Sequence, residues 1–295
     1  MNAPARRPLI PVLPTALTLG NLVCGFIAIA KTVDALQGAA PDGGPLDALF
    51  ADKIVQACWF LLASMVFDAL DGRVARLMNQ TSPFGTQLDS LADVVTFGMA
   101  PALLAKVTYE HTMNRLGLPF HHGVVTLLCS LYIIGAALRL ARFNVTTTED
   151  EASHDTFTGL PSPAAAAAVV TTCLFVFTGR HEIGVDAELA DKGAIVLLRC
   201  LPFIACALGL LMFSRVRYVH LAQRYVKQRT RAGTFVKMVI AGWIVVLFHE
   251  WLLFAVSALY VVGGLVLGLR AGVRGTSPAD ALPAPWDDDE EPPAP

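Results

Sequence analysis

The chain has 295 residues, of which 55% are hydrophobic and 16% are charged, and its mean hydropathy is +0.56. A soluble domain carries about 25% charged residues, so this composition excludes an ordinary soluble protein and indicates an integral membrane protein. The formal net charge of −2 does not point to a partner, and we expect no nucleic-acid ligand.

Apolar runs of about 17–25 residues predict roughly eight membrane-spanning helices. They lie near 15–33, 53–78, 85–107, 123–143, 162–179, 194–213, 234–249 and 251–269. The last two runs meet around Glu250, where one long broken helix is the alternative. Because backbone exposed to lipid must satisfy its hydrogen bonds internally, the expected fold class is an all-α polytopic helical bundle.

Both ends of the chain carry recognisable patterns. The first span follows Arg6 and Arg7 and ends in Ala28-Ile29-Ala30, which resembles the A-x-A cleavage site of a secretory signal peptide. The many spans that follow favour a retained first helix. Residues 275–295 are rich in Pro and acidic residues and predict a disordered tail. We therefore expect a transmembrane domain over 1–274 and a tail over 275–295.

The 22 Lys and Arg residues are distributed unevenly between the connections of the predicted spans. Most of them lie in the N-terminal segment and in alternate connections, including 73–76, 139–142 and 215–237. Positive residues accumulate on the cytoplasmic side of membrane proteins. This bias places the N-terminus and the turn at 79–85 in the cytoplasm, and we expect a bacterial inner membrane.

Four aspartates lie in the second and third spans, where each carboxylate costs about 2.5–3.5 kcal/mol on insertion scales. Asp68 and Asp71 are three residues apart, and Asp89 and Asp93 are four apart, so each pair shares one helix face. If the two spans form a hairpin, the pairs reach matching depths on adjacent helices.

The turn between the two spans supports this hairpin. Residues 79–84 contain good helix breakers, and Thr81 or Ser82 is a candidate N-cap for the third span. Four carboxylates at matching depths can hold two divalent cations through oxygen ligands alone. The alternative to a metal site is that the four Asp side chains only form hydrogen bonds or Asp–Arg pairs between helices and take no part in a reaction.

Small and basic residues accompany the carboxylates. Gly72 and Gly85 leave room for a bulky ligand against the helices, and Arg76 adds a cation that can bind phosphate. Two metal ions beside such a surface suit phosphoryl or phosphatidyl transfer, with one Asp accepting the proton of an alcohol.

The stretch from Asp68 to Asp93 matches the pattern D-x-x-D-G-x-x-A-R-x8-G-x3-D-x3-D throughout. It resembles the signature of the CDP-alcohol phosphatidyltransferases. The resemblance implies that Asp68, Asp71, Asp89 and Asp93 bind two Mg²⁺ or Mn²⁺ ions and that Asp93 is the general base. It also implies that Gly72, Arg76 and Gly85 contact the CDP moiety and that the protein is a homodimer.

Further segments resemble the serine-specific branch of that family, which uses CDP-diacylglycerol and L-serine. They are LPTALTLGNLVCGFIAI (13–29), ALRLARFN (137–144), FTGLPSPAAA (157–166) and FSRVRY (213–218). With the signature, the resemblance spans about residues 9–220. It implies that the phosphatidyl group is transferred to the serine hydroxyl with release of CMP, at the cytoplasmic face.

Basic residues near the cytoplasmic ends of the spans are candidates for binding anionic groups. Arg139 and Arg142, with Asn144 just beyond, suit the carboxylate of a free amino acid. Snorkelling of both arginines to the interface is the alternative. Arg215 and Arg217 are candidates for binding the CDP phosphates or anionic lipid headgroups.

Two alternative functions remain open. Glycerol 3-phosphate, inositol phosphate or choline could replace serine as the acceptor. Arg139 and Arg142 do not decide between them, because they could bind either the phosphate of a phosphorylated acceptor or the carboxylate of serine. A divalent-cation transporter could use the same four Asp residues. Transporters often consist of repeated halves, and the sequence contains no second Asp-rich half.

Overall fold

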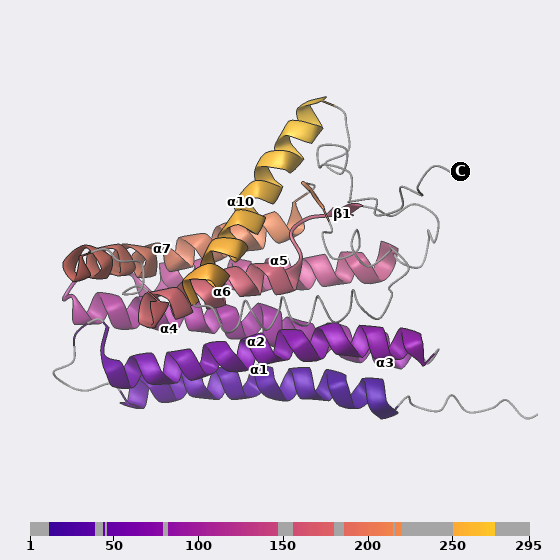
Figure 1. Ribbon diagram of the computed structural model, residues 1–295, viewed down its shortest axis with the longest axis horizontal. Coiled ribbons are helices and arrows are strands. Elements are labelled where there is room, and N and C mark those ends of the chain that lie inside the picture. Colours follow the sequence, from indigo (N-terminus) through magenta and orange to yellow (C-terminus); the bar gives the residue numbers. More distant parts are fainter. Residues whose placement is uncertain are drawn as a thin grey trace, which may run out of the picture.

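Long helices lying side by side form most of the computed structural model, and a last helix, α10, leans across them (Figure 1). The structure describes residues 12–38, 44, 46–78, 82–146, 156–179, 186–214, 216–219 and 250–274. In chain order the elements are α1 (Val12–Gly38), α2 (Ala48–Leu77), α3 (Pro83–Asp93), the π-helix η1 (Val94–Met99), α4 (Ala100–Arg115), α5 (His122–Thr146), β1 (Thr156–Thr158), α6 (Ser162–Phe177), α7 (Ala187–Phe213), β2 (Arg217–Val219) and α10 (Glu250–Arg274).

Six described helical stretches are long and apolar enough to cross a membrane, and α6 is a shorter apolar helix. The six are Val12–Gly38, Ala48–Val74, Phe84–Arg115, His122–Val145, Ala187–Phe213 and Glu250–Gly268. The prediction of a polytopic helical membrane protein is confirmed. The span predicted at 234–249 and the tail predicted at 275–295 lie outside the described residues.

The hairpin between the second and third spans forms where the helix breakers predicted it. α2 ends at Leu77, and Ser82 is the N-cap of α3, with Pro83 in the first turn. The backbone N–H of Gly85 donates to Oγ of Ser82 at 3.0 Å. This cap satisfies one of the amide groups that a helix start leaves without a partner.

The third span contains a π-helical turn that its apolar pattern did not indicate. α3 passes into η1 at Asp93 and then into α4 without a break, and the N–H of Ala100 donates to the carbonyl of Val95. An i→i+5 bond places one extra residue in the turn, which rotates the following helix face by about 100°. η1 contacts both α1 and α5.

α5 and α7 cross at two glycines. A Cβ atom on Gly209 would lie 2.6 Å from Cα of Tyr132, and one on Gly135 would lie 2.8 Å from Cα of Gly209. Small residues allow helix backbones to approach this closely in membrane proteins. The crossing joins α7 to the buried core, in which Tyr132 and Leu201 are fully enclosed.

Two short strands tie the start of α6 to the end of α7. β1 pairs with β2 in antiparallel orientation, with Phe157 opposite Tyr218. Gly159 follows β1 with a φ of 90°, and its N–H donates to the carbonyl of Val216 at 2.8 Å. A side chain at Gly159 would collide with the carbonyl of Met212, so this tie depends on glycine.

Candidate functional site

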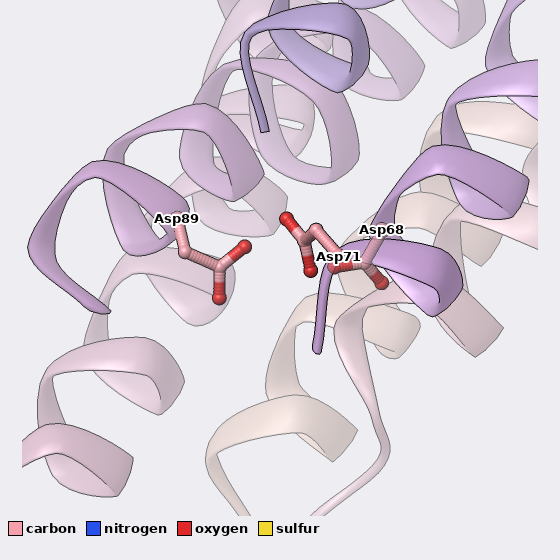
Figure 2. Close-up of side chains that lie close together, drawn as sticks. All are labelled: Asp68, Asp71 and Asp89. Atoms are coloured by element: carbon pink, nitrogen blue, oxygen red, sulfur yellow. The ribbon is translucent and has the colours of Figure 1, made fainter. Parts of the chain in front are cut away.

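Three carboxylates from the α2–α3 hairpin lie close together. Asp68 and Asp71 come from α2 and Asp89 from α3, and one oxygen of each residue lies within 4.8 Å of the others. Figure 2 shows the carboxylate of Asp89 directed toward Asp71 and Asp68 from the opposite helix. Asp71 is buried, and the other two are partly buried. The i, i+3 spacing on α2 places both of its carboxylates toward α3.

Asp93 lies one helical turn beyond Asp89, at the end of α3, and its side chain is buried. Its Oδ1 accepts a hydrogen bond from Nδ2 of Asn21 at 3.2 Å. The carboxyl group of Asp93 interacts electrostatically with those of Asp68 and Asp89. The structure therefore places the fourth predicted carboxylate beside the group of three, with one oxygen engaged by α1.

α1 contributes two polar partners that sequence reasoning missed. Oγ1 of Thr18 donates to Oδ2 of Asp71 at 2.9 Å, and Asn21 donates to Asp93. Thr18 and Asn21 are three residues apart in the apolar N-terminal half of α1 and are both buried. Two polar residues at helical spacing in a membrane span were the signal that could have identified them.

The donor set fits a divalent cation. Oδ1 of Asp89 and Oδ1 of Asn21 are buried and have no hydrogen-bond partner among the described residues. A buried acceptor without a partner costs about 1–3 kcal/mol, which a bound cation would offset. Carboxylate and amide oxygens are the ligands that hard divalent cations such as Mg²⁺ and Mn²⁺ prefer.

Of the residues predicted to bind the acceptor alcohol, Arg139 is the one that interacts with the carboxylates. Its Nη1 donates to Oγ of Ser162 at 2.9 Å, and its guanidinium lies within electrostatic range of Asp93 and Asp68. The side chain of Arg139 is partly buried, and that of Ser162 is fully buried. This arrangement differs from the snorkelling alternative, because the guanidinium interacts with the protein interior.

Arg142 and Asn144 contact other helices. Nη2 of Arg142 donates to the carbonyl of Phe213 at 2.9 Å, and its guanidinium lies 4.5 Å from the centre of the Phe213 ring. Nδ2 of Asn144 donates to Oγ of Ser90 at 3.0 Å. The two residues thus connect the end of α5 to α7 and α3.

The predicted nucleotide contacts are only partly described. A Cβ on Gly72 would meet no described atom within 4 Å, and one on Gly85 would lie 3.2 Å from Oγ of Ser82. Arg76 belongs to α2 and Arg217 to β2, and Arg215 lies outside the described residues.

Comparison with known proteins agrees with the motif. The family model described as CDP-alcohol phosphatidyltransferase matches residues 11–198. A CDP-diacylglycerol–serine O-phosphatidyltransferase of Helicobacter pylori strain J99 is 42% identical over 167 residues, which are 56% of this chain and 61% of that protein. The match therefore spans about three fifths of that relative's length.

Two further relatives are matched over more of their length. A CDP-diacylglycerol–serine O-phosphatidyltransferase of Bacillus subtilis strain 168 is 31% identical over 209 residues, which are 70% of this chain and 90% of that protein. An archaetidylserine synthase of Methanothermobacter thermautotrophicus is 33% identical over 208 residues, covering 70% of this chain and 69% of that protein.

Proposed function

The chain belongs to the CDP-alcohol phosphatidyltransferase family, and from this premise we propose that it transfers the phosphatidyl group of CDP-diacylglycerol to L-serine, giving phosphatidylserine and CMP. The observation that carries the proposal is the convergence of Asp68, Asp71 and Asp89 inside two apolar helices. Serine as the acceptor is supported by the names of the bacterial and archaeal relatives.

Asp68, Asp71, Asp89 and Asp93 would together hold two divalent cations, Mg²⁺ or Mn²⁺. When bound, such ions neutralise the charge of the bridging phosphates and stabilise the attacking and leaving oxygens. The oxygen of Asp89 that has no partner among the described residues supports this role.

Asp93 acts as the general base. Asn21 holds Oδ1 of Asp93, and this bond orients the carboxylate that takes the proton of the serine hydroxyl. The serine oxygen then bonds to the phosphorus nearer the glycerol, and the bond from that phosphorus to the oxygen of CMP breaks. CMP leaves with this oxygen and its electron pair.

Arg139 binds the serine carboxylate. The electrostatic interaction of its guanidinium with Asp93 and Asp68 supports this assignment. A serine bound to Arg139 through its carboxylate would have its hydroxyl on the side of the general base. Ser162 steadies the guanidinium through its hydroxyl. Arg142 and Asn144 are the other residues that bind serine in this proposal. The CDP moiety is contacted by Gly72, Arg76, Gly85, Arg215 and Arg217.

The active site faces the cytoplasm of a bacterial inner membrane in this proposal. The support is the concentration of Lys and Arg in the N-terminal segment and in alternate connections. The acyl chains of CDP-diacylglycerol lie in the bilayer, and its head lies over the carboxylates. Assembly as a homodimer belongs to the same proposal and rests on family membership.

The experiment that tests the proposal is release of CMP by the purified protein, given CDP-diacylglycerol, Mg²⁺ or Mn²⁺, and one acceptor at a time. Asp93→Asn is the inactive variant, and Asp52→Asn, an exposed Asp near the start of α2, is the matched control. We expect release with L-serine, abolished only by Asp93→Asn. Release only with glycerol 3-phosphate, inositol phosphate or choline would overturn serine, and no release with any acceptor would overturn the transferase.

A further inference from the structure

The π-helix η1 begins directly after Asp93. Asp93 is the N-cap of η1, and the N–H of Ala100 donates to the carbonyl of Val95, which forms the π-turn. Such turns carry one residue more than an α-helical turn and are frequent at functional sites. The side of the helix on which Asp93 stands therefore depends on whether this turn is π or α.

Tyr132 of α5 holds the π-turn from one side. Its side chain is fully buried, and its hydroxyl donates to the carbonyl of Phe97, inside η1, at 3.0 Å. A buried Tyr hydroxyl needs a hydrogen-bond partner, and a carbonyl in a distorted helical turn is a suitable one. Gly98 also packs toward α5, since a Cβ there would lie 3.4 Å from Cβ of Ala136.

α1 holds the π-turn from the other side. Oγ1 of Thr96 donates to the carbonyl of Asn21 at 3.4 Å. A Cβ on Gly25 would lie 3.1 Å from Cα of Thr96 and would collide with its hydroxyl, so α1 and η1 are in close contact. The side chain of Asn21 meanwhile binds Asp93. One residue of α1 therefore contacts both the carboxylate and the turn that follows it.

The displacement that a regular helix would bring can be estimated. The face of α4 is fixed by the core, where Ala100 and Leu104 are fully buried. Removing the extra residue would rotate α3 against this face by about 100°, which moves the Cα of Asp93 roughly 3.5 Å around the helix axis. A misplacement of about 1 Å can already cost 100-fold in rate.

We propose that Tyr132 is a positioning residue for Asp93, acting by holding the Phe97 carbonyl and with it the π-turn of η1. Tyr132 touches neither substrate nor metal in this role. The inference rests on the proposed function for the chemistry of Asp93, and on the hydrogen bonds of the structure for the coupling between Tyr132, η1 and Asp93.

The test is Tyr132→Phe, which removes only the hydroxyl. Tyr109→Phe is the matched control, because Tyr109 lies on α4 and packs its ring against Phe120, away from the carboxylates. With saturating Mn²⁺, we expect Tyr132→Phe to lower kcat at least about tenfold with an unchanged KM for CDP-diacylglycerol, because the variant displaces the general base and alters no group that contacts this substrate. Tyr109→Phe keeps the parental kcat.

Mn²⁺ binding followed by electron paramagnetic resonance gives a readout that does not require turnover. If Asp93 is displaced, the more weakly bound Mn²⁺ dissociates about tenfold more readily in Tyr132→Phe, as for loss of an interaction that orients a metal ligand. Tyr109→Phe leaves the affinity unchanged. Mn²⁺ affinity equal to that of the parent in Tyr132→Phe overturns the inference, whatever the rate.

Gly25→Ala provides a second variant in case Tyr132→Phe does not fold. It pushes on Thr96 from α1 and leaves Tyr132 intact, and we expect the same loss of kcat and of Mn²⁺ affinity. Parental values of both in a folded Gly25→Ala would overturn the inference. If the parent protein releases no CMP with any acceptor but both variants lose Mn²⁺ affinity, the proposed function fails and the positioning role stands.

Discussion

Gly209→Ala should destabilise the protein, because it adds a methyl group where α5 and α7 touch. The new Cβ would lie 2.6 Å from Cα of Tyr132, 2.7 Å from the carbonyl oxygen of Leu131 and 3.0 Å from the backbone N of Tyr132. The first of these distances is 0.8 Å inside the 3.4 Å at which ordinary van der Waals contact begins. All three atoms belong to the backbone, so no side chain can rotate away and the two helices must separate.

The expected magnitude follows from two opposing effects. Overpacking costs about 1–3 kcal/mol, and contact with backbone places this substitution near the upper end. Replacing Gly by Ala inside a helix stabilises by about 1 kcal/mol. The net loss is therefore about 2 kcal/mol, which corresponds to a fall in Tm of roughly 4–8 °C for a chain of this size.

Gly193→Ala is the control that separates the two effects. Gly193 lies on the same helix, α7, and a Cβ there would meet no described atom within 4 Å. It should gain only the helix propensity, raising Tm by roughly 2–4 °C. The measurement is thermal unfolding of the two variants and the parent in one detergent, followed by tryptophan fluorescence. A Tm for Gly209→Ala at or above that of Gly193→Ala would refute the close crossing of α5 and α7.

Three further predictions concern the hairpin and the carboxylates. Ser82→Ala removes the acceptor for the N–H of Gly85 and should cost about 1 kcal/mol in unfolding free energy, whereas Ser82→Asp keeps the cap; equal Tm values would argue against it. Thr18→Val removes the hydrogen bond to Asp71 and should weaken Mn²⁺ binding about tenfold, while Thr18→Ser binds as the parent does; retained affinity in the Val variant would contradict this role. Removal of divalent cations with EDTA should abolish CMP release, with recovery on adding Mg²⁺ or Mn²⁺ but not K⁺, since the site is made of oxygen ligands suited to divalent ions; activity in EDTA would exclude a metal-dependent reaction.

The parts of the fold that local chemistry determines could be predicted from the sequence. Apolar length identified the six spans among the described residues, because a helix must be long enough to cross the bilayer. Helix breakers and a Ser cap located the α2–α3 turn, and the spacing of Asp68 and Asp71 placed both carboxylates on one face. These features depend on residues within a few positions of each other along the chain.

Features that depend on packing between distant segments could not be predicted. Thr18 and Asn21 meet carboxylates that lie 53 and 72 residues further along the chain. The guanidinium of Arg142 lies over Phe213, which no local pattern links to it. The π-turn after Asp93 leaves the apolar pattern of the span intact, because a residue added to a helix buried on several sides still faces apolar neighbours.

The π-turn also has a consequence for comparing this chain with its relatives. A relative whose third span is a regular α-helix would need one residue fewer between the positions of Asp93 and Ala100 to present the same packing face. A structure-based alignment with such a relative would open a one-residue gap there, while residues 68–93 would align without a gap. Insertions and deletions at this point of the family would therefore record where helical turns changed type, independently of any change in the carboxylates.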